Sequence, residues 1–184
     1  MRPYQFNYNH FKNGFTLLEM VVVIVLIGFL ALIVLNRVWT YRVYAEEAAV
    51  TATVGNIRSA LGLEVAKLVV RGQAKNISKL ENTNPMQLLA QVPHNYLGEL
   101  EHNQTIDKKG VWYFDKAEHT LNYVVNFTEN FKTNVKGIPR TRHKLKVIYT
   151  DRNDNNRFDK YIDDVNGLDL VALEPYRWEI KNNN

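Results

Sequence analysis

One stretch of the sequence reads Asn13-Gly14-Phe15-Thr16-Leu17-Leu18-Glu19 and then continues without a charge from Met20 to Leu35. Between Phe15 and Leu35, Glu19 is the single ionisable residue. About 20 apolar residues are enough for a helix to cross the hydrocarbon core of a bilayer. The stretch therefore predicts a transmembrane helix at residues 15–35, and the other expectations for this chain follow from it.

The residues before Phe15 are polar and aromatic, and Arg2 and Lys12 are their charged members. A secretory signal has its small-residue cleavage site after the apolar core. Here the small residue, Gly14, comes before the apolar run. Cleavage after Gly14 would remove only a leader, residues 1–14, and leave the apolar helix on the mature chain.

This arrangement resembles the class III signal of type IV pilins and type II secretion pseudopilins. The resemblance rests on Gly14 followed by Phe15-Thr16-Leu17-Leu18-Glu19, and it covers roughly residues 12–60. It implies cleavage between Gly14 and Phe15 by a prepilin peptidase, followed by N-methylation of Phe15. It also implies assembly with other pilin or pseudopilin subunits on an inner-membrane platform, in a pseudopilus or a type IV pilus.

Glu19 is the unusual residue of this stretch, because a carboxylate inside a membrane-spanning helix usually has a partner. The resemblance implies that the Glu19 carboxylate pairs with the Phe15 amino group of a neighbouring subunit. The alternative is a carboxylate near the membrane edge that is solvated by lipid headgroups.

Composition narrows the remaining function classes. Loss of the leader removes two basic residues and lowers the formal net charge from +4 to +2, which gives no general case for nucleic-acid binding. The chain has no cysteine, which excludes a thiol nucleophile and, on the resemblance, favours a pseudopilin or minor pilin over a major pilin. The five histidines are scattered and no nucleotide-binding or hydrolase motif occurs, so we expect no enzymatic activity.

Charges on either side of the apolar stretch bear on orientation. Arg2 and Lys12 favour a cytoplasmic amino terminus, whereas Arg37 and Arg42 follow the stretch and weaken that argument. The topology implied by the resemblance agrees with the leader charges. We therefore expect a single-pass protein of the bacterial inner membrane, in contact with lipid, whose globular domain lies in the periplasm before it enters a filament.

The helix is expected to continue well beyond Leu35. No proline occurs between Pro3 and Pro85, and apolar residues recur at intervals of three and four. One set is small (Ala45, Ala48 and Ala52) and suits close packing of helices, while a larger set suits docking on a sheet (Val50, Val54, Ile57, Leu61, Val65 and Leu68). These patterns predict one helix from about Thr16 to about Arg71.

The rest of the chain reads as short elements. We expect a loop at 72–84, a short helix from Asn84-Pro85, a turn at 95–98, and a long polar loop at 128–143. We expect strands at 111–114, 121–127, 145–149 and 176–180, with residues 167–173 either a strand or a packed turn. The predicted fold is α+β and pilin-like, with a long N-terminal helix packed on an antiparallel sheet. The expected parts are the leader 1–14, the transmembrane helix 15–35, its amphipathic continuation 36–72 and a globular domain 73–184.

One loop carries a candidate calcium site. Its oxygen-bearing side chains occupy the first, third, fifth and ninth places of an EF-hand-like loop, followed by two further carboxylates: Asp151, Asn153, Asn155, Asp159, Asp163 and Asp164. Asn156 replaces the turn glycine and Ile162 replaces the bidentate carboxylate of the twelfth place. The alternative is an Asn/Asp-rich surface turn, in which Arg152, Arg157 or Lys160 pairs with the same carboxylates.

The basic segment from Lys136 to Lys146 supports a different class of function. Such a segment is usually a solvated loop, but with the Asp151–Asp164 loop it leaves open a membrane-anchored binding module for calcium-dependent adhesion or DNA uptake. We expect Trp112 and Trp178 to lie in the core rather than in a binding surface.

Overall fold

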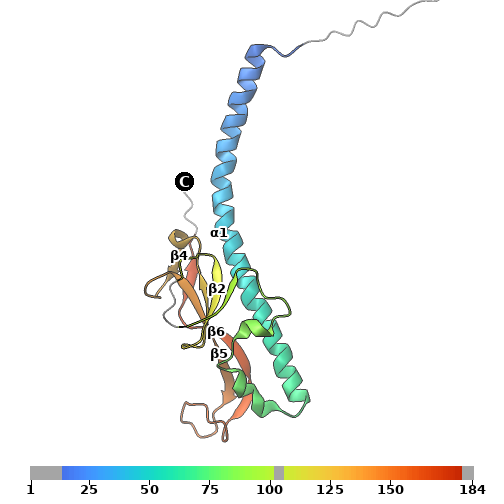
Figure 1. Cartoon of the computed structure of the whole chain (residues 1–184), viewed down its shortest axis with the longest axis vertical. Helices are drawn as coiled ribbons and strands as arrows, with labels where there is room; N and C mark the ends of the chain where they lie inside the picture. Colours follow the sequence, from blue (N-terminus) through green and yellow to red (C-terminus); the bar gives the residue numbers. More distant parts are fainter. Residues whose placement is uncertain (1–13, 102–105, 180–184) are drawn as a thin grey trace, which may run out of the picture. The chain divides into compact units, whose positions relative to one another are not determined.

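The computed structural model describes residues 14–101 and 106–179, so the expected leader lies outside the described residues except for Gly14. The chain divides into two compact units, Met1–Tyr41 and Arg42–Asn184. Helix α1 (Leu17–Val70) runs through the sequence of both units (Figure 1). The predicted single long helix is confirmed, with bounds one residue inside those expected.

Local chemistry explains where α1 begins and ends. At its start, the Thr16 hydroxyl oxygen accepts a hydrogen bond from the backbone N–H of Glu19 at 3.2 Å, which satisfies one of the free donors of the first turn. At its end, Gly72 has φ +67°, and the backbone N–H groups of Gly72 and Gln73 donate to the carbonyl oxygens of Val69 and Leu68. This is a Schellman ending, which favours glycine at the left-handed position.

The second unit contains a five-stranded sheet with the order β1-β2-β3-β5-β6. Its strands are β1 (Tyr96–Leu100), β2 (Val111–Asp115), β3 (Thr120–Val124), β5 (Arg140–Thr150) and β6 (Asp164–Ala172). Strand β1 runs parallel to β2, and every other neighbouring pair is antiparallel. A separate antiparallel ribbon pairs β4 (Phe131–Thr133) with β7 (Tyr176–Trp178). The α+β layout is therefore confirmed, with one parallel edge strand that the sequence did not indicate.

Three segments differ from the expectation. The predicted loop 72–84 contains the 3₁₀ helix η1 (Ala74–Leu80), whose Ile77 is buried in the core. The predicted turn 95–98 is wrong, because β1 begins at Tyr96 and absorbs Gly98, at φ +99°, in a register shift against β2. The predicted polar loop 128–143 contains η3 (Thr128–Asn130), β4 and the start of β5. In each case contacts with distant segments override the local preference for a loop or turn.

Other short elements agree with the sequence. Helix η2 (Pro85–Leu88) begins as predicted, with the Asn84 side chain accepting a hydrogen bond from the Met86 N–H at 3.0 Å. Residues 167–173 are resolved as a strand, since they form most of β6. The final predicted strand is β7, which pairs in the small ribbon, and its expected last residue, Ile180, lies outside the described part.

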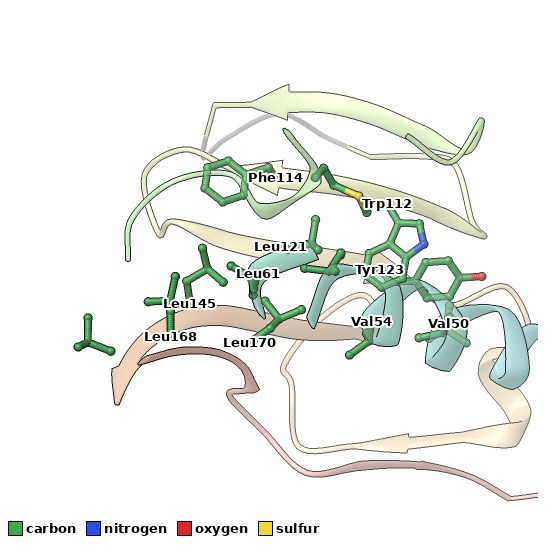
Figure 2. Packing of buried hydrophobic residues seen from close by; sticks show 14 of the residues in the cluster. Val50, Val54, Leu61, Trp112, Phe114, Leu121, Tyr123, Leu145, Leu168 and Leu170 are labelled. Carbon is green, nitrogen blue, oxygen red and sulfur yellow. The ribbon is translucent and has the colours of Figure 1, made fainter. Parts of the chain in front are cut away.

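The core lies between the second half of α1 and the sheet (Figure 2). Val50, Val54, Ile57 and Leu61 are buried there, and Val65 and Leu68 pack at its margin, as their spacing predicted. Trp112 is 1% exposed, and its ring centroid lies 4.9 Å from that of Tyr123. The core role predicted for Trp112 is therefore confirmed.

A buried carboxylate connects α1 to the end of β3. The Glu46 side chain is 8% exposed and accepts hydrogen bonds from the Tyr123 hydroxyl at 2.9 Å and from the backbone N–H groups of Asn126 and Phe127 at 2.6 and 3.1 Å. Burial and the neighbouring Glu46 charge raise the pKa of Tyr123, so its hydroxyl stays protonated and able to donate. The sequence analysis missed Glu46, although it lies at helical spacing between Val43 and Val50, both of which are buried.

His143 is a buried imidazole in the aromatic part of the core. It lies on β5 opposite Leu121, with Nε2 3.2 Å from the Tyr176 hydroxyl oxygen and its ring 5.7 Å from the Tyr176 ring. Burial lowers the pKa of His143 to about 4, and the positive charge of Arg58 acts in the same direction. The folded domain therefore holds this imidazole neutral.

Because His143 is buried and neutral, we expect the folded domain to lose stability in mild acid. The pKa of His143 is about 4 when folded and about 6.5 when unfolded, so below pH 6.5 the unfolded state binds the extra proton. The contribution of the neutral His143 to the free energy of unfolding should be fully present above pH 6.5. That free energy should fall by about 3 kcal/mol as the pH drops to 4. Urea unfolding of a fragment covering residues 42–184, repeated across this pH range, measures the slope of the free energy of unfolding against pH. His143→Phe should reduce the slope, whereas the same change at the exposed His94 should leave it unchanged.

Candidate functional site

The first part of α1 is apolar on all sides. Side chains from Phe15 to Leu35 are exposed in the chain, with Phe15 76% and Leu17 83% exposed. By length and composition, this part of the helix can cross a membrane. The helix continues through Gly28 without a break. A Cβ atom added at Gly28 would meet nothing within 4 Å. An apolar helix that the described residues 14–101 and 106–179 leave exposed requires lipid or other protein around it.

Gly14, Phe15 and Glu19 lie together at the start of this helix. Gly14 and Phe15 precede the first turn, and both are exposed. Glu19 lies in the first turn, where a negative side chain interacts favourably with the helix dipole. Its side chain is exposed, which leaves it accessible to a cationic group from outside the chain. The cleavage, methylation and pairing roles of these residues stay predictions.

A stripe of small residues follows one exposed face of the second half of α1. It extends the predicted small set and repeats at alternating steps of three and four: Ala45, Ala48, Ala52, Gly55, Ser59, Gly62 and Ala66. Cβ atoms added at Gly55 or Gly62 would meet nothing within 4 Å. Nothing in the described part of the chain therefore requires glycine at either place, although glycine costs a helix about 1 kcal/mol relative to alanine. This face suits close approach by another helix.

The loop between β5 and β6 holds the candidate calcium residues in a tight turn. Asp151 accepts hydrogen bonds from the backbone N–H groups of Asn153 and Asn156, at 3.1 and 2.6 Å. Asn156 has φ +60°, the left-handed conformation expected for the residue that replaces the turn glycine. The amide nitrogens of Asn153 and Asn155 both donate to Asp159 Oδ2, and these hydrogen bonds lower the pKa of Asp159.

The two remaining candidate carboxylates, Asp163 and Asp164, have protein partners. Asp163 accepts from the backbone N–H groups of Arg152 and Asp159, at 3.0 and 2.6 Å, and Asp164 pairs with the Arg152 guanidinium. Among residues 14–101 and 106–179, no three His, Cys, Asp or Glu side chains are grouped as metal ligands. To bind calcium with the ligands assigned from their spacing, the loop would therefore have to rotate the Asn153 and Asn155 amides, so that their oxygens and not their nitrogens lie toward Asp159. Calcium binding stays a prediction.

The basic segment 136–146 is not a solvated loop, because it lies mainly on β5. Arg142 pairs with Glu118 and Glu174 at 3.3 and 3.5 Å, and His143 is buried. Lys144 donates to the backbone oxygen of Glu118 at 3.2 Å. Arg142 is therefore ion-paired within the domain, whereas Lys136 and Lys146 are exposed, so the segment supports a nucleic-acid surface less strongly than its number of basic residues suggests.

Comparison with known proteins bears on the N-terminal site. Residues 9–35 match the family model described as the prokaryotic N-terminal methylation motif. The match covers Gly14, Phe15 and Glu19 together with the apolar stretch, and it confirms the resemblance to pilin-like proteins that the sequence indicated. No curated protein and no solved structure matches the chain.

Proposed function

We propose that the chain is a structural subunit of a type II secretion pseudopilus or a type IV pilus, either a pseudopilin or a minor pilin, with no catalytic role. The observation that carries the proposal is the methylation motif at residues 9–35, which leads directly into an exposed apolar helix. In this proposal, a prepilin peptidase cleaves between Gly14 and Phe15, and the Phe15 amine is methylated. The subunit is stored in the bacterial inner membrane with its folded domain in the periplasm.

Assembly would then use two parts of α1. The apolar part leaves lipid for contact with the same helix of other subunits, and the Glu19 carboxylate pairs with the Phe15 amine of a neighbour. The exposed small-residue face, with Gly55 and Gly62, supports close helix packing along the second half. Absence of cysteine favours a pseudopilin or minor pilin through the family resemblance.

Intact mass distinguishes this proposal from an ordinary anchored domain. In cells with prepilin peptidase, the membrane-extracted chain should begin at methylated Phe15, and in cells without it the chain should begin at Met1. Gly14→Leu should block cleavage, while Gly28→Ala, at another glycine with open space around it, should be cleaved normally. A cut after Leu35, or a Met1 start in both kinds of cell, would sink the proposal.

As a second and separate proposal, the Asp151–Asp164 loop binds Ca²⁺. Support comes from the alternating oxygen side chains and from the left-handed Asn156 at the place of the turn glycine. A bound cation would replace the hydrogen bonds from Asn153 and Asn155 to Asp159 and hold the loop through their side-chain oxygens. Such a site would make a calcium-dependent contact between the domain and its surroundings.

Calorimetric titration with CaCl₂ tests the loop directly. Asp151→Asn and Asp154→Asn each remove one negative charge, but only Asp151 occupies a ligand place of the loop. We expect Asp151→Asn to weaken Ca²⁺ binding about tenfold or more, a loss of about 1.4 kcal/mol, and Asp154→Asn to change it little. Equal weakening by the two variants would indicate general attraction to an acidic loop, and absence of binding heat in the wild type would remove the site.

A further inference from the structure

Aromatic and basic side chains follow the apolar stretch on α1. Trp39 is 60% exposed and Tyr41 is 65% exposed, although both have large apolar rings, and Arg37 is exposed beside them. All three belong to the unit Met1–Tyr41. Large exposed rings directly after an apolar stretch long enough to cross a membrane indicate an environment that is partly apolar and partly polar.

These side chains surround the helix instead of forming one face. At about 100° per residue, Arg37 and Tyr41 project within about 40° of each other, whereas Trp39 projects to the opposite side. The three residues span only about 6 Å along the axis. A docked protein would contact one side of the helix, but a membrane interface contacts all sides at one level.

Along the axis of α1, Trp39 lies about one bilayer thickness from the start of the helix. From Phe15 to Trp39 the helix rises about 36 Å, at about 1.5 Å per residue. A hydrocarbon core is about 30 Å thick, or about 40–45 Å with the headgroup regions. A helix that begins at one interface therefore brings Trp39 and Tyr41 into the opposite one.

We propose that Arg37, Trp39 and Tyr41 form an interfacial belt that binds phospholipid headgroups of the leaflet facing the folded domain. Trp and Tyr rings occupy the boundary between acyl chains and headgroups, where the indole N–H and the phenol hydroxyl can bond to ester oxygens. The planar Arg37 guanidinium binds lipid phosphate, whose oxygens accept hydrogen bonds from its fork of N–H donors. The belt fixes the depth at which the helix is held. The inference rests on the membrane-anchored state in the proposed function.

Depth-dependent fluorescence quenching tests the belt in the full chain. The wild type and Trp39→Phe are reconstituted into phosphatidylcholine vesicles whose acyl chains carry bromine either near the headgroup or near the chain end. The difference between the two proteins isolates Trp39 from Trp112 and Trp178. We expect the Trp39 signal to be quenched at least about twofold more by the shallow bromines, since the belt residues lie at the interface.

The other outcomes separate the belt from the anchor. If the chain floats with the vesicles but Trp39 is quenched only by aqueous iodide or mainly by deep bromines, the belt is wrong and the anchor stands. If the chain does not float with the vesicles, both are wrong. Protection of Trp39 that grows with the protein-to-lipid ratio would identify a second copy as the occupant and overturn the lipid assignment.

Discussion

Replacing Glu19 by alanine is expected to prevent the subunit from entering filaments while its folded domain keeps full stability. Assembly would bury the neighbouring Phe15 amine among apolar helices, and an ion pair that is buried and then loses one partner costs about 3 kcal/mol or more. Loss of that pairing corresponds to roughly a hundredfold change in the assembly equilibrium. The measurement is the fraction of subunit found in purified filaments, relative to the amount in membranes.

A conservative variant separates this role from helix capping. Thr16 and Glu19 have the spacing of a capping box, and Thr16 already accepts the hydrogen bond from the Glu19 N–H. Glutamine serves in a capping box as well as glutamate does, but it cannot form an ion pair. We therefore expect Glu19→Gln to fail in assembly like the alanine variant, with unchanged helix content by circular dichroism. Normal assembly of Glu19→Gln would show that capping, not charge pairing, explains the residue.

Replacing Glu46 by alanine should cost the folded domain about 3–5 kcal/mol. The change leaves the Tyr123 hydroxyl and two backbone N–H groups without their buried acceptor, and each unsatisfied group costs about 1–3 kcal/mol. The contact also ties α1 to the segment after β3, so its loss should allow the helix to separate from that end of the sheet. Urea unfolding of residues 42–184 at neutral pH gives the change in free energy of unfolding.

The adjacent residue supplies a matched control for Glu46. Glu47 is only half-buried, so Glu47→Ala removes the same charge and the same length of side chain at a neighbouring place on the helix. We expect that variant to stay within about 0.5 kcal/mol of wild type. Tyr123→Phe removes one of the three donors and should cost about 1 kcal/mol. Equal stability of the two glutamate variants would disprove the role assigned to Glu46.

Local patterns were sufficient for much of this fold. Helix α1 could be predicted because proline is absent and the apolar spacing from Val50 to Leu61 is regular over several turns. The start of η2 could be predicted from Asn84-Pro85, and β2 from its aromatic residues, because caps and aromatic strand residues act over a few positions. The N-terminal site was readable for the same reason, since its motif is continuous in sequence.

Features that depend on distant partners could not be read locally. Strand β1 contains Gly98 and looks like a turn, and only its pairing with β2 makes it a strand. Phe131 to Thr133 form β4 because β7 lies opposite. Glu46 looks like one more surface charge until Tyr123 and the segment after β3 enclose it. Arg142 of β5 likewise has its ion-pair partners, Glu118 and Glu174, in other parts of the chain.

The β4–β7 ribbon joins two segments that lie far apart in the sequence, so this part of the domain is complete only when both have been made. Translation produces Phe131 before Trp178, so Phe131 gains this neighbour, whose ring lies 4.8 Å away, only after β5 and β6 have been made. Until then, an aromatic part of the core stays open to proteases. We expect a chain truncated before Tyr176 to be degraded by proteases more readily than the full chain, because Phe131 would lose this contact. The β4–β7 pairing is therefore expected to protect full-length chains selectively.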